Sequence, residues 1–283
     1  MSSNETPGRK LLAVFAHPDD ESFGPGGTLA LYAKQGVAVH LICATRGEVG
    51  ETPADLGERT DENIARLRED ELRCAARALK LEEVHFLDYR DSGMPGADTN
   101  RHPRALASAP VEQVADKIAV LMRRIQPQVV ITFDPIGGYR HPDHVAIHDA
   151  TARAFHDVLA RPGTHNSPPQ KLYYHTFPKR LMRLMVRLMP LFGQNPREFG
   201  INKDIDLTEI ASVNYPIHAN IQVRSVMSEK AEASACHASQ HAGGSGGILG
   251  FALRFFGTKE PFMRAYPPAP DSLHERDLFE GLS

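Results

Sequence analysis

Short apolar runs alternate with longer segments of helical periodicity along the first two thirds of this chain, and this alternation limits the fold more than any other feature. Leu11–Ala16 is a continuous apolar run that ends in a polar cluster, as expected of a buried parallel strand. Similar runs follow at Val37–Ala44, Val84–Leu87, Val129–Phe133 and Leu172–Phe177. Helical segments separate them, at Gly26–Gln35, Glu62–Leu79, Val111–Ile125 and Val145–Leu159. The order predicts an α/β fold whose mostly parallel sheet has helices on both faces.

The last third of the chain is less regular and is predicted to be an irregular C-terminal elaboration of the same domain. Met227–His237 has a helical pattern, Ala242–Gly247 reads as a glycine-rich flexible joint, and Pro261–Pro270 is proline-rich and extended. Because no clear linker divides the chain, we expect a single domain over residues 11–270. Residues 1–10 are expected to be disordered and residues 271–283 to form a tail.

The segment 179–200 begins with Lys179–Met189, which combines arginines on one helical face with Leu and Met elsewhere. A buried helix or a subunit contact is the favoured interpretation. The functional alternative is a lid over the active site that accepts an apolar substrate tail. A basic amphipathic helix can also lie on a membrane, but that interpretation is not favoured from the sequence.

Composition excludes several classes of protein. Hydrophobic residues make up 41% and charged residues 24%, as in ordinary globular domains, and the net charge of −3 gives no electrostatic reason to expect nucleic acid. The three cysteines are far apart and form no CxxC, so neither a disulfide framework nor a cysteine zinc site is expected, and a reducing compartment is the default. Leu11–Ala16 is too short for a signal-peptide core or a membrane span. A cytoplasmic location follows as the expectation.

Two clusters of metal-ligating side chains follow predicted strands. The first strand ends in His17-Pro18-Asp19-Asp20, and the fourth continues through a loop into His141 and His144. Since the carboxyl ends of parallel strands share one edge of the sheet, these loops can converge. Three protein ligands and an open position for water are typical of catalytic zinc. We therefore predict His17, Asp20 and His144 as ligands, which leaves Asp19 and His141 for proton transfer.

Purely structural interpretations exist for the same residues. A lone His-Pro-Asp is often a turn that caps a helix, and a structural zinc site is usually closed by Cys and His. Two such clusters at strand ends, with spare acid and base groups, favour catalysis. Gly24, Gly26 and Gly27 lie between a strand and a helix, but they lack the third glycine of the dinucleotide fingerprint, and no Walker lysine follows. Phosphate binding by these glycines is thus a weak alternative.

Further motifs accompany these two loops. AHPDDE at Ala16–Glu21 and GGYxHPDH at Gly137–His144 are joined by TRGEVGE at Thr45–Glu51, RxxE at Arg68–Glu71, YRDSGM at Tyr89–Met94, and Lys230 with CHASQ at Cys236–Gln240. Together they make the chain resemble the LmbE-like (PIG-L type) zinc-dependent N-acetylglucosaminyl de-N-acetylases. The resemblance extends from about Leu11 to about Tyr266 and implies a Rossmann-like α/β sheet.

The resemblance also implies roles for individual residues. Zinc would be held by His17, Asp20 and His144, and Asp19 would be the general base. A cationic His141 would stabilise the oxyanion with Asp143 behind it, and Tyr139 would polarise the amide carbonyl. The implied substrate contacts come from Arg68, Asp91, His237 and Gln240. Arg140, where family members often have a small residue, leaves the substrate preference open.

The expected function is removal of an acetyl group from a GlcNAc-containing small molecule by metal-dependent amide hydrolysis. The alternative is an amidase that acts on a thiol conjugate or a glycoside with a non-acetyl acyl group. A non-catalytic nucleotide- or carbohydrate-binding domain is disfavoured, because a binding module needs no base beside a metal. Zn²⁺ is the expected cofactor, although Fe²⁺ or another divalent ion suits the same ligands. The expected partner is the small-molecule sugar substrate, with no nucleic acid, and the sequence leaves open whether the chain forms a homo-oligomer.

Overall fold

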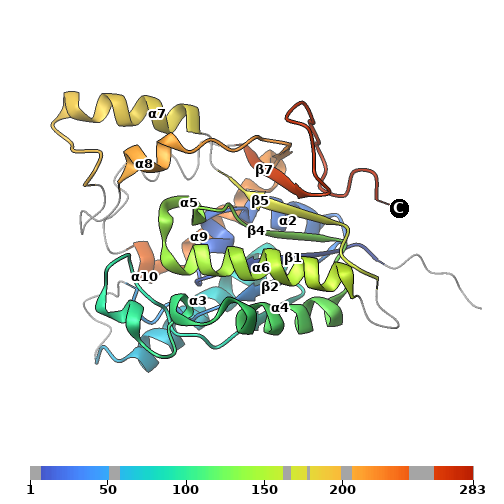
Figure 1. Ribbon diagram of the computed structural model, residues 1–283, viewed down its shortest axis with the longest axis horizontal. Coiled ribbons are helices and arrows are strands. Elements are labelled where there is room, and N and C mark those ends of the chain that lie inside the picture. Colours follow the sequence, from blue (N-terminus) through green and yellow to red (C-terminus); the bar gives the residue numbers. More distant parts are fainter. Residues whose placement is uncertain are drawn as a thin grey trace, which may run out of the picture.

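The computed structural model describes residues 8–50, 58–161, 167–176, 179–198, 206–241 and 258–282 (Figure 1). Its strands are β1 Lys10–Phe15, β2 Ala38–Cys43, β3 Glu83–Phe86, β4 Val129–Phe133, β5 Lys171–His175, β6 Ala219–Gln222 and β7 Lys259–Tyr266. Its α-helices are α1 Asp20–Phe23, α2 Gly26–Lys34, α3 Asp61–Leu79, α4 Val111–Ile125, α5 Gly137–Arg140, α6 Pro142–Ala160, α7 Lys179–Leu188, α8 Leu207–Ser212, α9 Met227–Cys236 and α10 Ala238–His241. Short 3-10 turns are η1 Asp98–Arg101, η2 Leu106–Ser108, η3 Met189–Phe192 and η4 Arg224–Val226.

All seven strands belong to one sheet, in the order β3-β2-β1-β4-β5-β7-β6. The strands from β3 to β5 are parallel, and β7 is antiparallel to both β5 and β6. The chain moves outward in one direction from β1 to β3 and in the other direction from β4 to β5. The carboxyl ends of β1 and β4 therefore flank a topological switch point, where ligands bind in open α/β sheets. The predicted fold class is confirmed.

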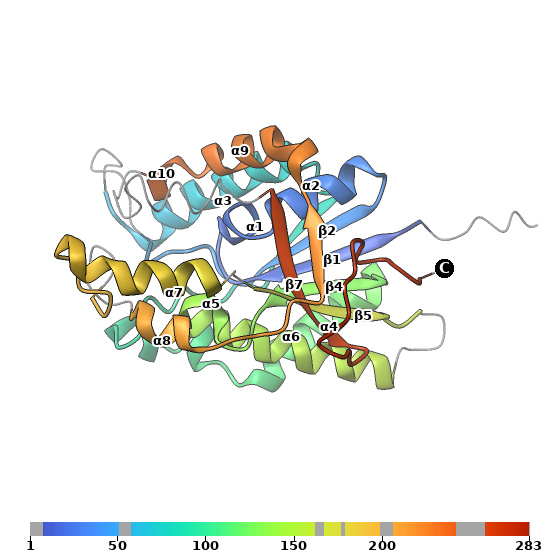
Figure 2. The same cartoon turned by 90° about the horizontal axis from the view of Figure 1, so that it is seen from above.

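Helices cover both faces of the sheet (Figure 2). On one face α2, α3 and α9 pack together, and on the other α4 packs along α6. Every residue of β4 and β5 is buried, as expected of central strands covered on both faces, although β5 begins with Lys171 and ends with His175. The sheet and its helices share one core, so the strand-end loops are held on a rigid base.

The C-terminal region contributes two strands that the sequence did not predict. The proline-rich stretch expected to be merely extended overlaps β7, which pairs with β5 and with the four-residue β6. Periodicity missed them because β6 is short and Pro261 interrupts the pattern of β7. Residues expected to form a tail pack against this part of the sheet: Leu278 and Phe279 are buried, and Glu275 accepts hydrogen bonds from Lys171 and Arg264, both at 2.8 Å.

The expectation of no disulfide is wrong. Cys74 on α3 and Cys236 at the end of α9 are bonded, with a separation of 162 positions in sequence. Helices α3 and α9 pack side by side, and this packing brings together two cysteines whose spacing had suggested no pairing. The bond also removes the cysteine argument for a reducing compartment. Cys43 is a buried free thiol.

In the part of the chain that the structure describes, no helix is both long and apolar enough to cross a bilayer. Most of the N-terminal segment predicted to be disordered, and the glycine-rich joint predicted at Ala242–Gly247, lie outside the described residues.

Candidate metal centre

Two loops build the centre, one after β1 and one after β4. The second loop is shaped by Asp134, whose carboxylate accepts hydrogen bonds from the backbone N–H groups of Ile136 and Gly138 at 3.2 and 2.8 Å. Gly137 adopts a φ of +61°, and a Cβ there would lie 2.5 Å from the Cβ of His144. Only glycine therefore lets the loop pass this close to the first turn of α6.

Side chains from both loops meet at a single point. His17 Nδ1 lies 3.2 Å from His144 Nε2, and the Asp20 carboxylate lies 3.6 Å from the first and 3.3 Å from the second. The other nitrogen of each ring donates to an acceptor: His17 Nε2 to Asp143 Oδ2 at 3.0 Å, and His144 Nδ1 to the Gly137 carbonyl at 3.1 Å. When both rings are neutral, each imidazole therefore presents its unprotonated nitrogen to the shared point.

This arrangement fits a divalent metal ion. Two unprotonated imidazole nitrogens 3.2 Å apart repel one another unless a proton or a metal ion lies between them. Ligands at about 2.0–2.2 Å around a tetrahedral zinc ion are themselves about 3.3–3.6 Å apart. The three observed separations are close to that range. His17, His141 and His144 also form a group whose ring nitrogens lie within 4.8 Å of one another.

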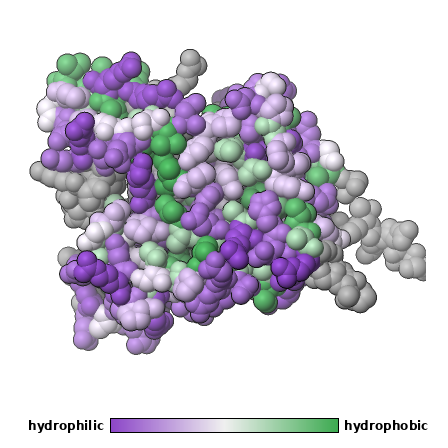
Figure 3. Space-filling model, in the orientation of Figure 1, coloured by the Kyte–Doolittle hydropathy of each residue, from purple (hydrophilic) through white to green (hydrophobic). Residues whose placement is uncertain are grey.

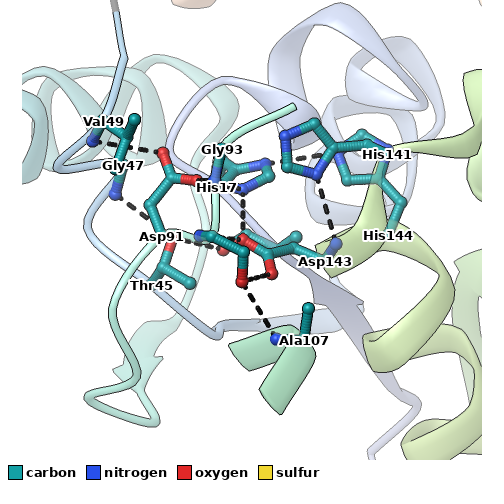
Figure 4. Close-up of polar contacts among 12 residues, drawn as sticks. His17, Thr45, Gly47, Val49, Asp91, Gly93, Ala107, His141, Asp143 and His144 are labelled. Atoms are coloured by element: carbon teal, nitrogen blue, oxygen red, sulfur yellow. Dashed lines mark hydrogen bonds and ion pairs between the residues drawn. The ribbon is translucent and has the colours of Figure 1, made fainter. Parts of the chain in front are cut away.

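Asp143 lies behind His17, so the expectation that it supports His141 is wrong. It is fully buried, accepts from His17 Nε2 and from the Ser92 N–H at 2.9 Å, and also accepts from the Ser92 hydroxyl. Position 143 is in the first turn of α6, and its side chain points back across the sheet edge toward β1 (Figure 4). A carboxylate in this position orients a ligating histidine and increases its basicity.

Asp19 lies beside the ligands in an unusual backbone conformation, with a φ of +123°. Its N–H donates to Glu21 Oε2 at 3.0 Å, and its carboxylate accepts from Arg68 at 3.1 Å. Burial raises the pKa of Asp19 to about 6, while the Arg68 guanidinium opposes this shift. A carboxylate that titrates near neutral pH suits general base catalysis.

His141 and Tyr139 flank the ligands from the second loop. The ring of His141 lies 4.6 Å from that of His17, and Tyr139 meets His144 edge-on at 5.0 Å (Figure 4 shows the three histidines). Burial lowers the pKa of His141 to about 2, and its two neighbouring histidines lower it further. This disfavours the cationic role implied by the resemblance. His141 Nδ1 accepts from the Asp143 N–H at 3.2 Å, so a neutral ring carries its proton on Nε2 and can still donate.

The residues implied as substrate contacts lie mostly behind the centre. Arg68 is buried and donates to Gly47 O and Pro18 O as well as to Asp19, which ties the loops after β1 and β2 together. Asp91 is buried, accepts from the Gly93 N–H at 2.8 Å and lies 3.5 Å from His17 Nε2.

His237 is also fully buried, and its Nε2 pairs with Glu21 at 2.7 Å. Gln240 is half-buried and donates to the Ser239 hydroxyl at 2.8 Å. Arg140, which leaves the substrate preference open, lies 3.3 Å from Glu209 of α8.

Three supporting residues were missed as functional candidates from the sequence. Ser92 holds Asp143, Glu21 holds both His237 and the Asp19 backbone, and Glu71 accepts from the N–H and hydroxyl of Ser239, both at 2.7 Å. Each belongs to a motif that was quoted for the resemblance. Apart from the motifs, the sequence signal that could have identified these three residues is that they are polar side chains in segments predicted to be buried.

Comparison with known proteins gives a consistent result. The family profile described as "PIG-L: GlcNAc-PI de-N-acetylase" matches residues 12–155. A 1D-myo-inositol 2-acetamido-2-deoxy-alpha-D-glucopyranoside deacetylase of Acidothermus cellulolyticus is 35% identical, covering 97% of this chain and 95% of the relative. A deacetylase of the same name from Kineococcus radiotolerans is 48% identical over 54% of this chain. That match covers 45% of the relative, which is less than half of its length. The crystal structure of a conserved protein from Thermus thermophilus matches with a TM-score of 0.60 and 23% identity, covering 92% of this chain and 96% of that one, which supports the fold alone.

Proposed function

Because this chain belongs to the PIG-L family of GlcNAc-PI de-N-acetylases, we propose that it hydrolyses the acetamide group of a GlcNAc-containing small molecule. The products are acetate and the free amino sugar. The observation that carries this proposal is the meeting of His17 Nδ1, His144 Nε2 and the Asp20 carboxylate beside Asp19. A GlcNAc-inositol glycoside is the first substrate to test, because relatives that span nearly the whole chain are named for it.

We assign the metal to His17, Asp20 and His144 and propose zinc as the ion. Asp20 is preferred to His141 as the third ligand, because the Asp20 carboxylate lies 3.3–3.6 Å from the two other ligand atoms. A divalent ion supplies Lewis acidity there and lowers the pKa of water toward about 7. Fe²⁺ also fits the same imidazole and carboxylate donors, and the availability of each ion in the cell often decides which one is bound.

Asp19 takes a proton from the attacking water in this proposal. Arg68 fixes the carboxylate at 3.1 Å, and Glu21 fixes the backbone of the same residue at 3.0 Å. The base is therefore positioned before the substrate arrives, which reduces the reorganisation needed during reaction. Asp19 can then return the proton to the leaving amine.

The tetrahedral oxyanion needs hydrogen-bond donors, and two are available from the second loop. His141 offers its Nε2 proton, because its other nitrogen is occupied by the Asp143 N–H. Tyr139 is partly exposed at the same edge and offers its hydroxyl. Loss of one donor typically costs about 100-fold or more in rate. Gln240 stays a candidate for substrate contact, whereas the buried Arg68, Asp91 and His237 suit the role of holding the centre in shape.

The decisive experiment measures acetate release from GlcNAc-inositol and from other N-acetylglucosaminides, together with the metal content of the purified protein. We expect about one metal ion per chain and turnover that is lost on chelation and regained with Zn²⁺ or Fe²⁺. His144→Ala should lose both metal and activity, while the exposed His102→Ala should change neither. Metal without turnover on any acetamido sugar would contradict the proposed substrate class. Release of a larger acyl group instead would favour the amidase alternative.

Cytoplasmic location stays a prediction, and the sequence leaves homo-oligomerisation open. Gel filtration with light scattering measures the oligomeric state directly.

A further inference from the structure

The large exposed hydrophobic side chains of this protein are concentrated in one segment. Among the described residues six are exposed, and four of these are Leu184, Leu188, Leu191 and Phe192, at 53%, 41%, 78% and 79% exposure. All four lie on α7 and the following turn η3, and Figure 3 shows hydrophobic atoms gathered where Figure 1 places α7. Concentrated exposed apolar surface marks an interaction site, whereas scattered single residues need no explanation.

The exposed leucines lie on a different side of the helix from the residues through which α7 packs on α8. Leu184, Leu188 and Leu191 are spaced by four and three positions, so they lie along one side. On the other side, Val186 and Met189 pack against α8 in a small cluster with Leu207 and Ile210. The helix is therefore anchored by one face and leaves a second apolar face, here called the α7 face, without a partner among the described residues.

The segment that carries the α7 face is itself positively charged, whereas the exposed Glu198 follows it and the neighbouring helix α8 carries the exposed Glu209. From residue 179 to residue 197 the sequence holds five Lys or Arg residues and no Asp or Glu, although the whole chain has a net charge of −3. Arg187 is exposed beside the leucines, and Arg183 is exposed and donates to Asn214 at 3.0 Å. Leu or Phe on one side with arginine alongside is the pattern of a helix that lies in the interface of a membrane.

We propose that the α7 face binds the surface of an anionic lipid bilayer. Its leucines and Phe192 would enter the boundary between headgroups and acyl chains, and its arginines would pair with lipid phosphates. A second copy of this chain is a poorer occupant, because a two-fold contact would set the same cationic surface against itself.

The position of α7 gives this binding a consequence for the proposed reaction. Helix α7 packs on α8, and α8 contacts α5, where Arg140 lies 3.3 Å from Glu209. Tyr139 of the metal centre is the residue before Arg140. Docking through the α7 face would therefore hold the centre close to the headgroups and favour substrates with a lipid anchor. Only this consequence rests on the proposed function; the binding itself does not.

Sedimentation with vesicles tests the binding without relying on catalysis. We expect the full chain to sediment with vesicles of phosphatidylcholine mixed with phosphatidylglycerol, and to bind much less to phosphatidylcholine alone or at high salt. Arg187→Gln should lower the partition coefficient about 5-fold, the usual effect of one basic residue near an anionic surface. The double variant Leu191→Asp with Phe192→Asp should lower it at least 10-fold, because both apolar contacts are lost.

Val120→Asp is the matched control, because Val120 is 64% exposed on α4, far from α7 in sequence. It should leave the binding unchanged. All variants should keep the wild-type melting temperature and the wild-type turnover of a water-soluble substrate, which separates loss of membrane binding from loss of fold or activity. Failure of the wild type to bind mixed vesicles overturns the proposal, as does equal binding by the double variant. Conversion of a dimer to a monomer by the double variant, with no vesicle binding, would also overturn it and assign the face to self-association.

Discussion

Asp19 shows how single residues at the centre are fixed by their neighbours. A non-glycine residue with a φ of +123° costs of the order of 1–3 kcal/mol, and such strain persists where surrounding contacts enforce it. Here Glu21 accepts from the Asp19 N–H, and Arg68 holds the carboxylate. The strained conformation coincides with the residue proposed as the base, which supports a functional reason for it.

Replacing Asp19 with Asn should lower kcat by about 100-fold or more, because the amide cannot accept the proton of the attacking water. Metal content should stay at the wild-type level, since the three proposed ligands are unchanged. Acetate release and metal analysis on the same preparation measure both quantities. Asp149→Asn, at an exposed position of α6, is the matched control and should behave as wild type. Full activity in Asp19→Asn would exclude Asp19 as the base.

Replacing Arg68 with Gln should lower the free energy of unfolding by about 2–3 kcal/mol, because two loop carbonyls and a carboxylate lose their shared donor. Turnover should also fall, because Asp19 loses its orienting contact. Urea unfolding and steady-state kinetics measure the two effects. Arg66→Gln is the control on the same helix: Arg66 is exposed and its ion-pair partner among the described residues is Glu62, so a change within about 0.5 kcal/mol is expected. Equal effects of the two substitutions would contradict the structural role of Arg68.

At the scale of elements, one side of α3 connects the centre to the C-terminal helices. Arg68, Glu71 and Cys74 are spaced by three positions and therefore follow one side of the helix. Arg68 reaches the β1 loop, Glu71 binds Ser239 of α10, and Cys74 is bonded to Cys236 of α9. The RxxE and CHASQ motifs, separated widely in sequence, are thus two halves of one contact between helices.

Reduction of the Cys74–Cys236 bond should destabilise the folded chain by roughly 2–5 kcal/mol, because it releases a long loop of the unfolded state. Urea unfolding with and without a dithiol reductant measures the difference. The double variant Cys74→Ser with Cys236→Ser should have the stability of the reduced wild type and should not respond to the reductant. A wild type whose stability is unaffected by reduction would show that packing of α3 on α9 suffices without the bond.

At the scale of the whole molecule, the sheet buries ionisable groups whose titration couples stability to pH. Burial lowers the pKa of His175, at the end of β5, to about 4; Lys230 lowers it further and Glu260 opposes the shift. The unfolded chain binds a proton at this histidine below about pH 6.5, whereas the folded chain does so only near pH 4. Stability contributed by neutral His175 is therefore complete above pH 6.5 and is lost as the pH falls from 6.5 toward 4.

Wild-type stability should accordingly decrease between pH 7 and pH 5 more steeply than that of His175→Gln. A shift of roughly 2.5 pKa units at about 1.4 kcal/mol each gives a largest difference of about 3.5 kcal/mol, of which about 3 kcal/mol is reached at pH 4. Urea unfolding of both proteins across this range gives the two slopes, so a constant loss of stability in the variant does not affect the comparison. Parallel curves would mean that His175 titrates normally in the folded protein.

Local sequence signals predicted the parallel strands β1 to β5 and the two loops of the candidate metal centre, but neither the strand order nor the antiparallel strands β6 and β7. Apolar runs such as Leu11–Ala16 and Val129–Phe133 are local signals, because a strand buried on both faces must be apolar along its whole length. His17, Asp20 and His144 could be proposed together, because parallel strands place their carboxyl ends at one edge, where the loops after β1 and β4 can converge. The family could be named from the motifs alone, and the comparisons confirm it.

Tertiary structure alone decided the contacts between side chains that are distant in sequence. Asp143 supports His17 across a separation of 126 positions, Glu21 pairs with His237 across 216, and Cys74 bonds to Cys236. Periodicity and motif spacing fix which face of its own element a residue occupies, but they carry no information about the facing element. The facing element is set by how helices and strands pack over the whole core. This packing decides which buried acid pairs with which buried histidine.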